Sequence, residues 1–295
     1  MASWQSKILN PVIRALVKRK LLKTHDAAGI RKAFGGVLPP PRGAQFSADV
    51  VGGMPGEWAK SGGAAAGTML YLHGGGYVGG STATHRPITA AFAIRGLDVF
   101  VPDYRLAPEN AFPAAVDDGL AAYKGLLDAG IAPAKLTIAG DSAGGGLALA
   151  ILLAAKAEGV TMPACAILLS PWTDLAVTGE TVRTNLDRDP MLTDSVLKDN
   201  AAFYLNGADP KNPLASPLYG DLAGLPPLMI TAGDTEVLLE DSTRFAARAR
   251  EHGVAVSLKI WEGMPHVWQL FQRVLPEARA AIEEAARFAK AHFST

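Results

Sequence analysis

The sequence predicts an α/β protein in which a mostly parallel sheet is covered by helices on both faces. Two observations predict this fold class. Short apolar runs alternate with helix-length segments along most of the chain, as in sheets whose strands are joined by crossover helices. Several of these runs are apolar at every position, which strands buried on both faces require. The length of 295 residues suits a single α/β unit.

The elements are expected in the following order. About 36 residues at the start are helical, with Ile8, Val12 and Leu16 at near-helical spacing and basic residues on the other face, until Pro39-Pro40-Pro41 ends the region. Ser61–Gly67 is interpreted as a hairpin turn. Strands are predicted at 68–72, 98–101, 136–139, 164–169, 228–231 and 256–261, and helices at 114–129, 144–158, 237–251 and 277–292.

Between residues 174 and 221 the alternation lapses, and only a helix at 195–205 is expected. An insertion at this point lies over the carboxyl ends of the strands, where open α/β sheets bind their ligands. The amphipathic N-terminal segment has two interpretations, a cover for the domain or a membrane-surface helix. Covering the domain is the commoner role.

Composition excludes several classes of protein. Hydrophobic residues make up 49% of the chain and the formal net charge is zero, which excludes a disordered protein. The balance of charges also lacks the basic excess on which nucleic-acid binding relies, so no nucleic acid is expected as a partner. No run approaches the roughly 18 apolar residues of a membrane span, and the charges around 8–20 do not fit a signal peptide. We expect a cytoplasmic protein without stable membrane association.

The single cysteine, Cys165, lies in an apolar run that is predicted to be a buried strand. We interpret it as an inert core thiol, and its isolation leaves no disulfide and no thiolate cluster for a metal. This usage fits a reducing compartment. No metal site is expected.

The candidate nucleophile is Ser142, in the sequence Gly140-Asp141-Ser142-Ala143-Gly144. The motif follows a predicted strand and begins an Ala-rich helix, which is the context in which a G-x-S-x-G pattern is meaningful. A serine held on such a sharp turn needs small residues two positions away on each side, and the two glycines provide them. An ordinary glycine-rich turn is the alternative interpretation.

The sequence His73-Gly74-Gly75-Gly76-Tyr77 comes directly after the predicted strand 68–72. Consecutive glycines let the backbone approach a ligand and direct its N–H groups at one point, as stabilising an oxyanion requires. We expect an oxyanion hole in the loop Gly74, Gly75 and Gly76, chiefly from Gly75 and Gly76, with the N–H of Ala143 as a further donor. A phosphate-binding loop is disfavoured, since no G-K-[ST] follows.

A hydrolytic serine needs a base and an acid that orients it. Among six histidines, His266 follows the last predicted strand, in a loop that can present it at the strand ends. The acid is expected after the strand 228–231, where Asp234 and Glu236 compete with Glu240 and Asp241. Residue identity alone does not choose among them, because acids near a helix start also serve as caps.

Together these motifs resemble the hormone-sensitive-lipase-like family of α/β-hydrolases, the bacterial class IV esterases. The resemblance covers most of the chain. Its landmarks in order are His73–Gly76, Asp103–Glu109 with Phe112–Ala115, Gly140–Gly145, Asp189–Leu192, and Ser216–Leu218 before Leu225–Pro227. The resemblance implies the α/β-hydrolase fold as a single domain over residues 1–295, with cap elements at about 1–38 and 183–205.

The resemblance also implies Ser142 as nucleophile and His266 as base. At the acid the chain departs from the common family pattern, an aspartate followed by Pro-Leu. Aligning on the leucine brings Glu236 to the place of that aspartate, because Val237-Leu238 follow, and leaves Asp234 as the alternative acid. Met191 and Tyr77 are candidate pocket residues, although each also suits the core.

The function expected from the motifs and the resemblance is hydrolysis of short- to medium-chain acyl esters through an acyl-enzyme. The substrate is a small-molecule ester, and no cofactor is needed. The motifs do not separate this activity from amide, lactone or sugar-acetate hydrolysis by the same triad. A non-catalytic small-molecule receptor on the same scaffold is a further alternative, which the presence of His266 disfavours. The resemblance makes a homodimer a candidate assembly.

Overall fold

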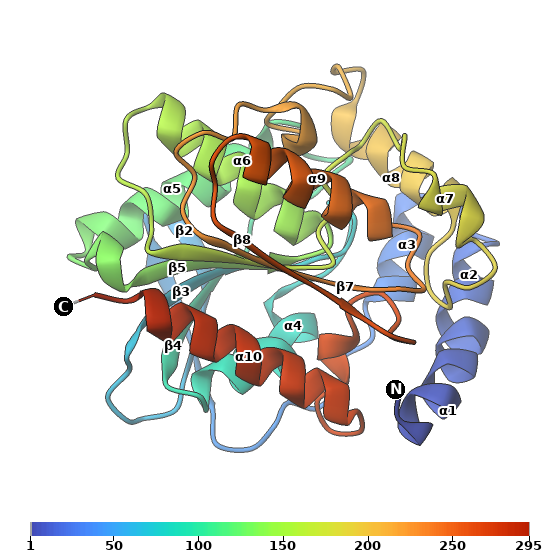
Figure 1. The fold of residues 1–295 in the computed structure, drawn as a ribbon, viewed down its shortest axis with the longest axis horizontal. Coiled ribbons are helices and arrows are strands. Elements are labelled where there is room, and N and C mark those ends of the chain that lie inside the picture. The colour runs from blue at the N-terminus through green and yellow to red at the C-terminus, as the bar shows by residue number, and fades with distance from the viewer. Residues whose placement is uncertain (1, 295) are drawn as a thin grey trace.

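In residues 2–294, the part of the chain that the computed structural model describes, eight strands form one sheet (Figure 1). The strand order is β1-β2-β4-β3-β5-β6-β7-β8. The pairs β1–β2 and β2–β4 are antiparallel, and all other neighbours are parallel. The strands are β1 (Gln45–Val51), β2 (Met54–Lys60), β3 (Gly67–Leu72), β4 (Leu97–Pro102), β5 (Leu136–Asp141), β6 (Cys165–Leu169), β7 (Leu228–Gly233) and β8 (Val256–Trp261).

Helices cover both faces of the sheet, as the apolar strands require. In Figure 1, α5, α6 and α9 lie over one face, and α4 and α10 lie over the other. These helices are α4 (Thr82–Ala93), α5 (Ala114–Asp128), α6 (Ala143–Ala157), α9 (Leu239–Glu251) and α10 (Pro276–His292). The remaining elements are α1 (Trp4–Ile13), the π-helical turn η1 (Arg14–Lys18), α2 (Arg19–Leu21), α3 (Ala27–Phe34), α7 (Thr181–Thr184), α8 (Asp194–Leu205) and the 3₁₀ turns η2 (Pro133–Lys135), η3 (Pro217–Tyr219) and η4 (Trp268–Phe271).

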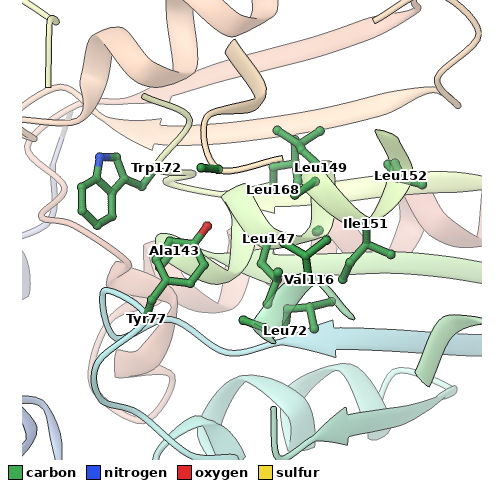
Figure 2. Packing of buried hydrophobic residues seen from close by; sticks show 14 of the residues in the cluster. Leu72, Tyr77, Val116, Ala143, Leu147, Leu149, Ile151, Leu152, Leu168 and Trp172 are labelled. Carbon is green, nitrogen blue, oxygen red and sulfur yellow. The ribbon is translucent and has the colours of Figure 1, made fainter. Parts of the chain in front are cut away.

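Two buried apolar layers hold these helices to the sheet. On the side of α5 and α6, Leu147 packs next to Val116 and Leu72, as Figure 2 shows. On the other side, Phe92 of α4 and Ile282 of α10 belong to one buried cluster with strand residues. Helix α6 is buried almost along its whole length, which explains why its sequence is apolar on every side.

The predicted fold class is confirmed, and the strands and helices predicted after residue 67 lie within two residues of those observed. The helical region predicted over about the first 36 residues begins at Trp4 and is interrupted at 22–26, between α2 and α3. The hairpin β1–β2, helix α4 and the short helix α7 were not predicted. Most side chains of β1 are exposed, so this strand lacks the apolar run by which the others are detected. The prediction of a hairpin turn at Ser61–Gly67 is wrong, because this segment joins β2 to β3 and β4 lies between them. The hairpin turn is formed instead by Gly52 and Gly53, both at positive φ.

The N-terminal helices lie along one edge of the molecule, beside the segment that follows α7 (Figure 1). Nζ of Lys18 donates to the carbonyl oxygen of Asp189 at 2.7 Å, and Arg14 donates to that of Asp187 at 2.6 Å. His25 and Asp199 of α8 lie 2.8 Å apart. The helical region ends at Phe34, before the prolines that were expected to end it.

Candidate active site

Ser142 lies at the sharp turn between β5 and α6. Its backbone has a φ of 54° and a ψ of −124°, a conformation that L-residues rarely adopt and that recurs at functional sites. The turn is possible because its neighbours are small. A Cβ on Gly140 would lie 2.3 Å from the carbonyl oxygen of Gly144, and one on Gly144 would lie 2.1 Å from that of Leu72. Ser142 is thereby held at the end of β5, on the wall of a cavity.

Ser142, His266 and Glu236 form a hydrogen-bonded chain between the loops that follow β5, β7 and β8. Nε2 of His266 lies 2.9 Å from Oγ of Ser142, and Nδ1 lies 2.7 Å from Oε2 of Glu236. The other carboxylate oxygen accepts hydrogen bonds from the N–H of Gly233 at 2.5 Å and from Oγ of Ser170 at 2.7 Å. This arrangement presents one imidazole nitrogen to the hydroxyl and holds the other against a carboxylate.

Burial and pairing act in opposite directions on the pKa of His266. The side chain is almost fully buried, and burial alone lowers the pKa because the charged imidazolium is desolvated. The charge of Glu236 and its hydrogen bond outweigh this effect and raise the pKa above its ordinary value. A cation that forms on His266 is therefore stabilised by Glu236.

Asp234 lies on the same loop as Glu236 but is directed elsewhere. Its Oδ1 accepts from the N–H of Gly263 at 2.7 Å, and its Oδ2 lies 3.2 Å from Nη2 of Arg188. About a third of the side chain, 32%, is exposed. Of the two acids to which the resemblance narrowed the choice, Glu236 contacts His266, and Asp234 connects the loop after β7 to the loop after β8.

The glycine loop after β3 presents backbone N–H groups beside Ser142. Gly75 has a φ of 125° and Gly76 a φ of 64°, which glycine adopts without a Cβ clash. Within residues 2–294, the N–H groups of Gly75, Gly76 and Ala143 have no hydrogen-bond partner. All three residues are buried or nearly so, and the two glycines line the cavity together with Ser142. These are suitable donors for a negatively charged oxygen.

Gly74 does not join this group of donors. Its N–H points to Oδ1 of Asp141 at 3.1 Å and to Nε2 of His85 at 3.2 Å. The inclusion of Gly74 among the oxyanion donors is therefore corrected: its N–H is occupied, and the residue anchors the loop.

A buried polar network beneath the glycine loop was not found from the sequence. Oδ1 of Asp141 accepts from the hydroxyl of Tyr71 at 2.7 Å, and Oδ2 lies 3.3 Å from Nε2 of His85. Burial alone raises the pKa of Asp141, but the charge and hydrogen bonds of its partners outweigh this and lower it. Tyr104 stacks on His73 with ring centroids 4.3 Å apart and donates to its carbonyl oxygen. The only signal in the sequence is the position of Asp141 next to Ser142.

Asp189 is a second buried acid whose role was not predicted. Its Oδ1 accepts from the N–H groups of Met191 at 2.7 Å and Leu192 at 3.0 Å, and its Oδ2 accepts from that of Val237 at 2.9 Å. The side chain is fully buried. It ties the segment before α8 to the residue that follows Glu236.

The cavity in front of Ser142 and His266 is mostly apolar. It is lined by side chains from the loop after β6, from the segment around α8 and from the N-terminal region, among them Trp172, Met191, Leu192, Leu197, Phe34 and Leu38. Met191, a candidate pocket residue from the sequence, lies on the wall. Tyr77 does not line the cavity. It is buried behind it, stacked on Tyr204 with centroids 3.8 Å apart and close to Trp172 and Ala143 (Figure 2).

The range of residues 2–294 contains no group of three or more His, Cys, Asp or Glu side chains that could hold a metal ion. None of its helices has the length and hydropathy needed to cross a membrane.

The fold and the site define an α/β-hydrolase, and comparisons with known proteins support this class. Residues 69–270 match a family model described as the alpha/beta hydrolase fold. The match covers more than half of the chain, and the chain therefore belongs to the α/β-hydrolase fold family.

Individual relatives and solved structures show which kinds of α/β-hydrolase this chain is similar to. An acetyl-hydrolase of Streptomyces hygroscopicus is 44% identical over 261 residues, which cover 88% of this chain and 85% of that protein. The solved structure of EstE5 soaked with ethyl alcohol has a TM-score of 0.95 and 41% identity over 100% of both chains, and crystals of EstE5 were also soaked with p-nitrophenyl butyrate. An esterase of the bacterial hormone-sensitive lipase family has a TM-score of 0.91 and 41% identity, again over 100% of both chains. The resemblance found in the motifs is confirmed.

Proposed function

We propose that the protein is a serine carboxylesterase that hydrolyses short- to medium-chain acyl esters. The observation that carries the proposal is the chain of contacts from Ser142 through His266 to Glu236, with distances of 2.9 Å and 2.7 Å, on the wall of an apolar cavity. An uncharged acyl ester suits such a cavity. The relatives, which are named esterases and acetyl-hydrolases, support the same substrate class.

Ser142 acts as the nucleophile in two steps. Nε2 of His266 takes the hydroxyl proton as Oγ attacks the carbonyl carbon of the ester, and a tetrahedral intermediate forms. The bond to the leaving alcohol then breaks, and His266 gives its proton to the alcohol oxygen. Water attacks the acyl-enzyme in the same way, so that the carboxylic acid leaves and Ser142 is restored. Glu236 orients the imidazole and stabilises its cation.

The negative charge of each tetrahedral intermediate is stabilised by the N–H groups of Gly75, Gly76 and Ala143. Their free hydrogen-bonding capacity and fixed loop geometry support this role. Removing one such donor typically costs about 10²- to 10³-fold in kcat. All steps use groups of this chain and water.

The segments at about 1–38 and 183–205 are proposed to form a cap on one domain that spans residues 1–295. The hydrogen bonds of Arg14 and Lys18 to the segment 186–189 support this division. Phe34, from one segment, and Met191, from the other, both line the cavity. Substrate size is therefore set by the cap as well as by the catalytic loops.

A cytoplasmic location remains part of the proposal, and the buried free thiol of Cys165 supports a reducing compartment. Cell fractionation tests the location. A homodimer is the assembly suggested by family resemblance, and light scattering after size exclusion tests it.

The test of the function is hydrolysis of p-nitrophenyl butyrate by the wild type and by Ser142→Ala. We expect a wild-type rate that saturates with substrate, and a loss of at least about 10⁴-fold in kcat for the variant, because the nucleophile is absent. Circular dichroism confirms that the variant is folded. Comparable rates in the two proteins would exclude the proposed mechanism. A panel of amides, lactones and sugar acetates separates the alternative substrates.

A further inference from the structure

The N-terminal helix leaves an apolar face uncovered. Trp4, Ile8, Val12 and Leu16 are exposed by 67%, 59%, 44% and 59%. They recur at every fourth residue through α1 and η1, so they form one stripe along the helix, which we call the apolar stripe. The other side of the helix packs on the protein through buried Ile13. Burying a large apolar side chain contributes about 1.5–3 kcal/mol, so covering the stripe is favourable.

Apolar surface depressions lie between the apolar stripe and residues of the catalytic cavity. A surface depression is lined by Trp4, Ile8 and Val274, which is itself 55% exposed. Val274 also belongs to a neighbouring depression that is lined by Leu38 and Leu270. These last two residues line the cavity that contains Ser142. The apolar stripe and the catalytic cavity are therefore linked by shared apolar neighbours, Val274, Leu38 and Leu270.

The charge of the same segment is entirely basic. Residues 2–25 contain six Lys or Arg residues and no Asp or Glu, in a chain whose formal net charge is zero. Arg14 and Lys18 donate to the segment 186–189, whereas four others are exposed: Lys7, Arg19, Lys20 and Lys23. Arg273 adds an exposed cation beside Val274.

Acidic groups also lie beside this segment. Glu277 accepts hydrogen bonds from the N–H and the hydroxyl of Ser3 at the start of α1. Asp187 lies near the buried Lys18 and is itself exposed, and Asp26, which follows the segment, is exposed and accepts from the N–H of Gly29. Of the exposed cations, Lys7 precedes Ile8 of the apolar stripe, and Arg19, Lys20 and Lys23 follow its last residue, Leu16.

We propose that α1 docks on an anionic membrane surface. The apolar stripe enters the boundary between headgroups and acyl chains, and the exposed lysines and arginines face anionic headgroups. A helix with Trp and aliphatic residues on one face and basic residues beside them is typical of interfacial helices. Each Lys or Arg near an anionic surface contributes about 1 kcal/mol. The docking is peripheral and reversible, and so it agrees with the absence of stable association expected from the sequence.

A second copy of this chain is the alternative occupant of the stripe. Pairing two such faces would bring the basic residues of both copies together, and like charges at an interface are unfavourable. Charge complementarity therefore favours a lipid surface. The orientation has one consequence that rests on the proposed function: docking of α1 brings Leu38 and Leu270, which line the cavity of Ser142, close to the bilayer, from which an ester dissolved in the lipid is taken up.

The test is co-sedimentation of the full chain with vesicles of phosphatidylcholine alone, and with vesicles that also contain phosphatidylglycerol. Three proteins are compared: the wild type, Ile8→Gln/Leu16→Gln in the stripe, and Val50→Gln/Ile260→Gln as a matched control. Val50 and Ile260 are exposed apolar residues on other elements. Thermal unfolding verifies that each protein is folded.

We expect the wild type and the control to bind the anionic vesicles at least tenfold more tightly than the neutral vesicles. Their binding to the anionic vesicles should also weaken at least tenfold at about 1 M salt, where the Debye length is about 3 Å. The stripe variant should lose at least tenfold in binding. Equal binding by the stripe variant, or no binding by the wild type, overturns the proposal. A different result would assign the face to a second copy of the chain: the wild type is a dimer, the stripe variant is a monomer, and neither protein binds vesicles. Hydrolysis of p-nitrophenyl butyrate without lipid tests the catalytic proposal separately.

Discussion

Oε2 of Glu236 lies 2.7 Å from Nδ1 of His266, although the two residues are 30 positions apart in the sequence. Asp234, only two residues from Glu236, holds Gly263 on the loop that precedes the histidine. The two acids therefore have different contacts at this site. One contacts the imidazole, and the other fixes the loop that carries it.

Replacing Glu236 by Gln is expected to lower kcat for p-nitrophenyl butyrate by about 10³- to 10⁴-fold, because a neutral amide neither fixes the imidazole tautomer nor stabilises its cation. Asp234→Asn is the matched control and should stay within about tenfold of the wild type, since its amide oxygen can still accept from Gly263. Steady-state kinetics measure both. A collapse of kcat in Asp234→Asn alone would reverse the assignment of the acid.

The pH profile of kcat/KM should report the pKa of His266, which must be neutral to act as a base. Because Glu236 raises this pKa above its ordinary value of 6.5, activity is expected to increase with pH through an apparent pKa above 6.5. In Glu236→Gln the negative charge is lost while burial remains, so the residual activity should rise at lower pH than in the wild type. An unchanged midpoint in this variant would show that Glu236 does not control the titration.

Gly76→Ala is expected to reduce kcat by about 10²-fold through damage to the oxyanion loop. The new Cβ would lie 2.1 Å from Nδ2 of Asn200, and φ is 64° at this position. Gly207→Ala is the matched control, because Gly207 also has a positive φ, 89°, but no atom lies within 4 Å of a Cβ there. Both variants should lose thermal stability, while kcat falls only in Gly76→Ala. Equal kcat values would remove Gly76 from the oxyanion site.

Shortening Met191, which lies on the cavity wall, should extend the range of acyl chains. Met191→Ala is expected to raise kcat/KM for p-nitrophenyl octanoate relative to butyrate by roughly tenfold, since one or two methylenes of extra space are worth about 1–3 kcal/mol. Tyr77→Phe serves as the control, because its ring is buried behind the wall and keeps its stacking on Tyr204. The ratio of the two substrates is the measured quantity. No change in this ratio would place the acyl chain elsewhere in the cavity.

Stability should decrease at alkaline pH because of Asp241, a buried acid outside the active site. Burial, and then the nearby charge of Asp174, raise its pKa from 3.8 to about 8, so folding favours the protonated form. The stability that this group contributes is present below about pH 4 and is lost as pH rises through about 8. Asp241→Asn stays neutral and keeps an acceptor for the N–H of Thr173. Its Tm should exceed that of the wild type by several degrees more at about pH 9 than at about pH 5.

A constant difference in Tm between wild type and Asp241→Asn at the two pH values would contradict this assignment. Glu284→Gln is a suitable control, since this residue lies on the surface and pairs with Lys259. Its effect on Tm should be small, as is typical of exposed ion pairs.

The buried strands, and the turn that carries Ser142, were predictable because their signals are local. A strand covered on both faces must be apolar throughout, and a serine on a sharp turn needs Gly140 and Gly144 beside it. The β1–β2 hairpin was missed because β1 lies at the edge of the sheet with most side chains exposed. There the pairing of backbone groups, and not an apolar run, makes the strand.

The sequence by itself determined the fold class, the order of the motifs and the candidates for the site, because each depends on neighbouring residues. Three features were decided only by the tertiary structure: the contact of Glu236 with His266, the occupied N–H of Gly74, and the position of Tyr77 behind the cavity. In each of them the direction of a side chain or an N–H group is set by partners from distant parts of the chain. Spacing along the chain brings such groups to the same end of the sheet, but packing and hydrogen bonds determine which of them meet.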